Sequence, residues 1–96
     1  MDKESTIRKY LELYSIPTSS IGYRALYLAI SIASEHPEYS CNKIFEMVSQ
    51  CLWKNGADWR RAYKNAHYAI SKTKYDKGPY TFVKDCSIGL EAKESY

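Results

Sequence analysis

Residues 58–74, DWRRAYKNAHYAISKTK, read as one amphipathic helix with two very different sides. At about 100° per residue, the apolar side chains gather on one side: Trp59, Ala62, Tyr63, Ala66 and Ile70. The polar side chains gather on the other: Arg60, Arg61, Lys64, Asn65, Tyr68, Ser71 and Lys72. No Asp or Glu lies between Trp59 and Tyr75, so we expect a cationic surface without internal counter-ions. Such a surface attracts solvent anions or a polyanion.

The residues just upstream predict a second helix, from a cap at Asn42 to about Trp53. Its apolar residues recur at helical spacing and form one stripe: Ile44, Met47, Val48, Cys51 and Leu52. Asn55-Gly56 indicates a turn, and Asp58 is a good N-cap because its carboxylate meets the positive end of the helix dipole.

Two helices joined by a tight turn, the second with a basic outer side, are the outline of a helix-turn-helix over about residues 43–72. In such a motif the second helix, here about residues 58–72, enters the major groove of DNA.

The flanking segments are also helical in pattern. Ser5 or Thr6 can cap a first helix, which Pro17 stops. The run 22–34 is apolar on nearly every side and predicts a central helix, which ends at His36-Pro37.

Residues 82–90 suggest one last short helix, weakened by Gly89. Strand alternation extends nowhere over more than a few residues. We therefore predict an all-α fold, a compact bundle of about five to six short helices containing the helix-turn-helix, as a single domain over residues 1–96.

Composition places the chain among ordinary globular domains. Hydrophobic residues at 45% and charged residues at 26% argue against a disordered chain. The net charge is only +3, so anion binding must come from local clustering of cations and not from a generally basic surface. The first residues lack a signal-peptide pattern, and the apolar run 25–33 is too short to cross a bilayer, so no membrane association is expected.

The cysteines indicate a reducing compartment. Cys41, Cys51 and Cys86 form an odd set without a C-x-x-C pair, and neither His36 nor His67 lies at ligand spacing from two of them. We expect reduced thiols, no metal and a cytoplasmic location.

The candidate site residues are those of the cationic side. Arg60, Arg61 and Lys64 lie in the half of the helix that reaches base edges, and Arg61 is the first candidate because a guanidinium grips guanine with two hydrogen bonds. Asn65 carries the amide that pairs with adenine in the same way. The remaining candidates are expected at phosphates: Tyr68, Ser71 and Lys72.

The residues 44–66, IFEMVSQCLWKNGADWRRAYKNA, resemble without a gap the pattern LYPxIAKKYNTTxSxVERxIRxx. This pattern belongs to the DNA-binding effector domain of the sporulation-initiation response regulators of spore-forming bacteria. Upstream, residues 21–24, IGYR, resemble the KGYRYL segment that opens the second helix of that domain. Downstream, Phe82-Val83 and Leu90 resemble its closing FIAxxADKL helix if two residues are deleted.

By this resemblance, Arg61 and Lys64 match arginines that face DNA in the family, and Asn65 stands at a supporting or phosphate-contacting position. Arg60 replaces a glutamate that helps to select bases in the family, so we do not expect the family's recognition sequence here.

The sequence departs from the family elsewhere as well. Lys54 and Asn55 replace a threonine pair at the helix start, and Glu46 replaces a proline. The family's receiver domain has no counterpart in these residues, so control by phosphorylation within this polypeptide is not expected.

Two functions remain open. The first is sequence-specific binding of double-stranded DNA by a small bacterial transcriptional regulator, with a homodimer as a further expectation because one short helix seldom supplies enough contact. The second is a protein–protein interaction module that keeps the scaffold, has lost operator binding and uses its tyrosine-rich surface. No nucleophile with its base, no pair of facing carboxylates and no phosphate loop is visible, so we expect neither an enzyme, nor a cofactor, nor a small-molecule substrate.

Overall fold

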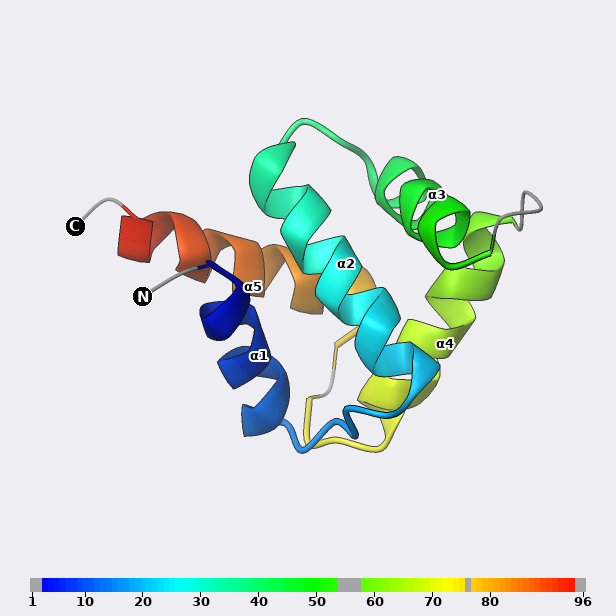
Figure 1. Cartoon of the computed structure of the whole chain (residues 1–96), viewed down its shortest axis with the longest axis horizontal. Helices are drawn as coiled ribbons and strands as arrows, with labels where there is room; N and C mark the ends of the chain where they lie inside the picture. The colour runs from blue at the N-terminus through cyan, green and yellow to red at the C-terminus, as the bar shows by residue number, and fades with distance from the viewer. Residues whose placement is uncertain (1–2, 54–57, 76, 95–96) are drawn as a thin grey trace.

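The computed structural model describes residues 3–53, 58–75 and 77–94, and within these ranges it contains helices and no strand (Figure 1). The helices are α1 (Lys3–Leu13), α2 (Ile21–Glu35), α3 (Cys41–Leu52), α4 (Trp59–Ser71) and α5 (Pro79–Glu94). The predicted all-α fold is therefore confirmed, with five helices in a compact bundle.

Three of these helices begin at side chains that accept a hydrogen bond from the first turn. Ser20 Oγ accepts from the backbone N–H of Tyr23 at 3.1 Å and Ser40 Oγ from that of Lys43 at 3.2 Å. The Asp58 carboxylate accepts from the N–H of Arg60 at 3.2 Å, which confirms the predicted cap of α4. Each bond satisfies a backbone donor that has no partner within the helix.

Two predicted caps were wrong. Ser40, and not Asn42, caps α3, because Ser40 has the extended backbone of a cap (φ −73°, ψ 166°) and the helix already begins at Cys41. Ser5 and Thr6 lie inside α1, which begins at Lys3.

Helix α2 is the centre of the fold. Figure 1 shows it in the middle, with α1 and α5 toward one side and α3 and α4 toward the other, and it contacts all four. Its inward residues are fully buried: Ala25, Leu26, Ala29 and Ile30. Burying a large aliphatic side chain contributes about 1.5–3 kcal/mol, so the apolar character of α2 accounts for the predicted central position.

A close approach at Gly22 sets how α4 lies against α2. A Cβ atom built on Gly22 would lie 2.6 Å from the Cβ of Ala69 and 2.7 Å from the backbone oxygen of Asn65. Only glycine fits this crossing without moving one of the helices, and α4 is held where the two backbones nearly touch.

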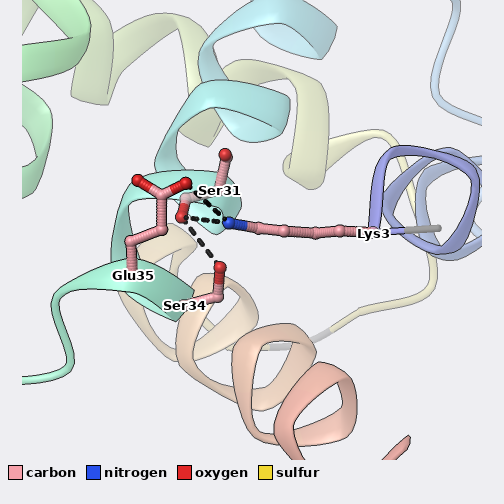
Figure 2. Close-up of polar contacts among 4 residues, drawn as sticks. All are labelled: Lys3, Ser31, Ser34 and Glu35. Carbon is pink, nitrogen blue, oxygen red and sulfur yellow. Dashed lines mark hydrogen bonds and ion pairs between the residues drawn. The ribbon is translucent and has the colours of Figure 1, made fainter. Parts of the chain in front are cut away.

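Lys3, at the start of α1, bonds to the end of α2 (Figure 2). The Lys3 ammonium donates to the backbone oxygen of Ser31 at 3.2 Å and pairs with the Glu35 carboxylate at 3.1 Å. Ser34 Oγ donates to the same Ser31 oxygen at 2.8 Å. The positive charge therefore lies at the negative end of the α2 dipole, where it is stabilising.

The last helix is longer than the sequence predicted. α5 runs for 16 residues and continues through Gly89, so the expectation of a short, weakened helix was wrong. Pro79 occupies the first helical position, where its missing N–H costs nothing. Phe82 and Val83 are buried against the rest of the core, and Phe82 meets Tyr14 and Tyr75 edge to face, with ring centroids 5.1 Å away in both cases.

Candidate nucleic-acid interface

Helices α3 and α4 are consecutive and packed together over residues 41–71, close to the predicted 43–72. The buried Ser49 of α3 donates its hydroxyl to the backbone oxygen of Asp58 at 2.8 Å. Phe45 of α3 meets Tyr63 of α4 edge to face at 5.4 Å. These contacts fix the start of α4 relative to α3. The predicted turn at Asn55-Gly56, like Lys54, lies outside the described residues.

The two sides of α4 follow the predicted period for most residues, and Trp59, Tyr63 and Asn65 are the half-buried exceptions. Its inner side is buried: Ala62, Ala66, Ala69 and Ile70. Its outer side is exposed: Arg60, Arg61, Lys64, His67, Tyr68, Ser71 and Lys72. Trp59 and Tyr63, which were expected in the core, pack against it but stay half-buried at the boundary. The helix ends at Ser71, so Lys74 lies beyond it.

Arg60 has a counter-ion, in contrast to the expectation of a face without one. Its guanidinium pairs with the Asp58 carboxylate at 3.2 Å. Asp58 lies directly before the helix, so the absence of acidic residues within α4 does not exclude this ion pair. Both side chains are more than half exposed, and such surface pairs contribute little and are screened by salt. The pair reduces the local charge but leaves Arg60 accessible.

Arg61 is held by an aromatic ring from the end of α3. Its Cζ atom lies 4.3 Å from the ring centroid of Trp53, the half-buried C-cap residue of α3. A cation–π contact of this kind uses the charge of the guanidinium and leaves its N–H groups available as donors. Lys64, one turn further along, is exposed and forms no ion pair with any residue that the structure describes.

Asn65 lies apart from the arginines. It is half-buried where α4 crosses the start of α2, and its side-chain amide donates to the backbone oxygen of Arg61 at 2.9 Å. One of its two donors is therefore engaged within the helix. The structure places Asn65 at the rim of the cationic face, with less freedom to pair with a base than the sequence suggested.

The site residues at the end of α4 lie together, beside the start of α2 and away from the arginines. The Lys72 ammonium lies 4.3 Å from the centroid of the Tyr68 ring, and Ser71 donates its hydroxyl to the backbone oxygen of Tyr68 at 2.7 Å. Tyr68 and Lys72 line a hollow of about 260 Å³ together with Pro17, Ser20 and Ile21. The structure thus divides the predicted site residues into an arginine group and a tyrosine–lysine group.

Trp53 and Ile21 were missed as site residues. Trp53 supports Arg61, and Ile21, which is 48% exposed, borders the hollow beside Tyr68. A tryptophan just before a cationic helix was a visible signal for the first. Nothing in the local pattern around Ile21 pointed to α4, because their contact depends on how the helices cross.

The cysteines are spread over the molecule. Cys86 is buried, Cys41 half-buried and Cys51 exposed. Burial raises the pKa of the Cys41 thiol and, with a smaller contribution from the Asp85 carboxylate, raises that of Cys86 to about 12. Among the residues that the structure describes, no helix has the length and apolar character needed to cross a membrane.

Comparison of the chain with family models, with curated proteins and with solved structures found no significant match. The resemblance to the effector domain of the sporulation-initiation regulators therefore stays a prediction. Over the residues that it describes, the structure itself defines a bundle of five helices in which α4 exposes a cationic side.

Proposed function

We propose that the chain is a small transcriptional regulator that binds double-stranded DNA with sequence preference, with α3 and α4 as its helix-turn-helix and α4 in the major groove. One observation carries this proposal: α4 and its C-cap residue expose Arg60, Arg61, Lys64 and Lys72, and α4 contains no acidic residue. DNA presents about one negative charge per 1.7 Å of its axis, so a row of cations along an exposed helix matches it.

The contacts that hold α4 in its orientation support the same proposal. A recognition helix must keep its orientation while its side chains bind, and α4 is fixed by the Ser49–Asp58 hydrogen bond at its start and by the Gly22 crossing further along. In the proposed complex Arg61 contacts a base edge, with guanine as the preferred partner because of the paired donors of a guanidinium. Lys64 and Lys72 contact phosphates.

The test is binding of the full chain to duplexes selected from a random DNA pool, measured at several salt concentrations. The affinity should fall steeply as salt rises. Arg61→Ala should cost about 1–3 kcal/mol and relax the preference at one base pair, whereas Lys64→Ala should weaken all sequences equally and lower the salt slope by about one.

Lys9→Ala is the matched control, because it removes an exposed positive charge from α1 and not from α4. Its affinity and salt slope should stay close to those of the unchanged chain. A selection that enriches no sequence, or a Lys9→Ala loss as large as that of Arg61→Ala, would contradict sequence-specific binding through α4.

A second candidate is a protein–protein interaction module on the same scaffold. It is favoured by the hollow between α2 and α4, where Ile21 and Tyr68 are 48% and 63% exposed, and by the Arg60–Asp58 pair, which lowers the charge of the face. Association of this kind should be insensitive to salt and weakened by Ile21→Glu. DNA binding should instead respond to salt and tolerate that substitution.

A further inference from the structure

A second concave site lies away from the outer face of α4, where α1, α2 and α3 meet. Its volume is about 310 Å³, at the lower end of the range of small-molecule pockets. Six residues line it: Arg8, Tyr23, Arg24, Tyr27, Leu28 and Leu52. Figure 1 shows α2, which contributes four of them, between α1 and α3. We call this site the Arg8–Arg24 pocket.

The walls of the Arg8–Arg24 pocket are apolar and well supported. Tyr23, Tyr27, Leu28 and Leu52 are each half-buried, and each packs against the hydrophobic core. One part of every wall residue is therefore fixed by the core while another part faces the pocket. Rigid aromatic and aliphatic walls of this kind accept the apolar body of a ligand with little loss of side-chain entropy.

The charges of the pocket have one sign. Arg8 and Arg24 are exposed, and no carboxylate of the described residues lies within 4.0 Å of either guanidinium. Glu4 and Glu12, which lie one helical turn before and after Arg8, form no ion pair with it. No acidic residue occurs in the α2 sequence from Ile21 to Ser34. Within the part of the chain that the structure describes, the two arginines that line this apolar pocket therefore have no ion-pair partner.

We propose that the Arg8–Arg24 pocket binds a small amphiphilic carboxylate, an apolar chain or ring with one anionic head group. The apolar body would rest on the two tyrosines and two leucines, and the carboxylate would accept hydrogen bonds from one or both guanidiniums. Arginine suits this role because its paired donors match the two oxygens of a carboxylate. The pocket chemistry does not depend on whether α4 binds DNA.

Other ligands fit the pocket less well. A neutral hydrophobe would leave both arginines unpaired, and an organic cation would be repelled by them. A sugar or nucleotide needs several hydrogen-bonding groups along its body, whereas most of the wall is apolar. The combination of an apolar wall and two arginines at the same pocket favours an apolar acid.

Octanoate is a suitable probe, added to the isotopically labelled full chain while backbone amide signals are followed by NMR. Octanol and octylamine share its chain and lack its charge or reverse it. Octanoate should shift the signals of residues around 8, 23–28 and 52, and the two analogues should bind about tenfold more weakly or not at all. At least one of the variants Arg8→Gln and Arg24→Gln should weaken octanoate binding about tenfold.

Arg60→Gln is the control, since Arg60 is an exposed arginine on α4 outside the pocket. It should bind octanoate like the unchanged chain, and circular dichroism should show that all three variants stay helical. Equal binding of octanol, equal weakening by Arg60→Gln, or unchanged affinity in both pocket variants would each overturn the proposal. Tighter binding of a glutamate-containing helical peptide than of octanoate would assign the pocket to a protein partner and would overturn it as well.

Discussion

The guanidinium of Arg61 lies over the indole ring of Trp53, with 4.3 Å between Cζ and the ring centroid. Trp53 caps the C-terminus of α3 and Arg61 lies in the first turn of α4, so the contact joins the two helices beside their connection. A long, flexible arginine is thereby held in place before any partner arrives. Restricting a side chain in this way lowers the entropy lost on binding.

Removing the Trp53 ring should therefore weaken the proposed DNA binding without changing the charge of the protein. A cation–π contact at an exposed site contributes about 0.5–1 kcal/mol, so Trp53→Ala should lower the affinity for a selected duplex about two- to fivefold. Trp53→Phe, which keeps an aromatic ring, should lose less. Fluorescence anisotropy with a labelled duplex measures both, and equal affinities for the two variants would contradict a role of the ring.

Gly22→Ala should destabilise the fold and displace α4. The added Cβ would meet Asn65 and Ala69 at distances that real Cβ atoms do not reach, and overpacking of this kind costs about 1–3 kcal/mol. Gly78→Ala is the matched control, because the nearest atom to its Cβ would be the Tyr63 hydroxyl at 3.7 Å, an ordinary contact. Urea unfolding of both variants checks the difference; a Gly22→Ala midpoint equal to that of Gly78→Ala would count against the tight crossing.

The buried Ser49 should matter more to stability than the buried Ser87. Ser49 donates to Asp58 across two helices, whereas Ser87 donates to the oxygen of Lys84 within its own helix. Ser49→Ala should cost about 1 kcal/mol, because the Asp58 carbonyl keeps the backbone N–H of Arg61 as a donor but loses the hydroxyl that bonds it to α3. Thermal unfolding of Ser49→Ala and Ser87→Ala compares the two, and the reverse order of stability would contradict this view of the α3–α4 junction.

The buried thiol of Cys86 should make the protein less stable in alkali. The folded state holds the pKa of this thiol at about 12 against an ordinary value of 9.0. Between these two values the unfolded chain releases a proton that the folded chain retains. The unfolded state then binds fewer protons, so the free energy of unfolding falls as pH rises, by up to about 1.4 kcal/mol per pH unit from this group.

Cys86→Ala removes that contribution at the cost of some packing. Urea unfolding at about pH 8.5 and about pH 10.5 should show a smaller loss of stability for Cys86→Ala than for the unchanged chain. Other groups also titrate in alkali, so the difference between the two slopes reports on Cys86 together with its small influence on the pKa of Tyr75. Identical slopes would show that the thiol ionises as easily in the folded state as in the unfolded one.

The sequence predicted correctly those features of the fold that depend on residues close together in one helix. The period of α4 predicted which side is buried, and Asp58 was the expected cap of that helix. The start of α3 was misplaced because Ser40 and Asn42 are both competent caps, and only the backbone angles decide between them. α5 extends through Gly89 because burial of Phe82, Val83 and Cys86 outweighs the weak helix propensity of a glycine, about 1 kcal/mol.

The candidate site could be predicted only on its outer side. Exposure of Arg61, Lys64 and Lys72 follows from spacing along one helix. The position of the Trp53 ring beside Arg61 depends on how α3 and α4 pack, and the hollow that Ile21 and Tyr68 line depends on how α2 and α4 pack. The periodic pattern of one helix contains no information on either. The Arg60–Asp58 pair was missed for a simpler reason, because the acid lies one residue before the helix.

Alanines form most of the inner side of α4: Ala62, Ala66 and Ala69. Their short side chains let the helix sit deep against its neighbours, so hardly any interlocking of large groups ties its outer residues to the interior. Substitutions at positions 60, 64, 68 and 72 should consequently leave the buried side of α4 undisturbed. In the proposed complex, exchanging this outer row should change the preferred ligand while the alanines keep the helix in its place.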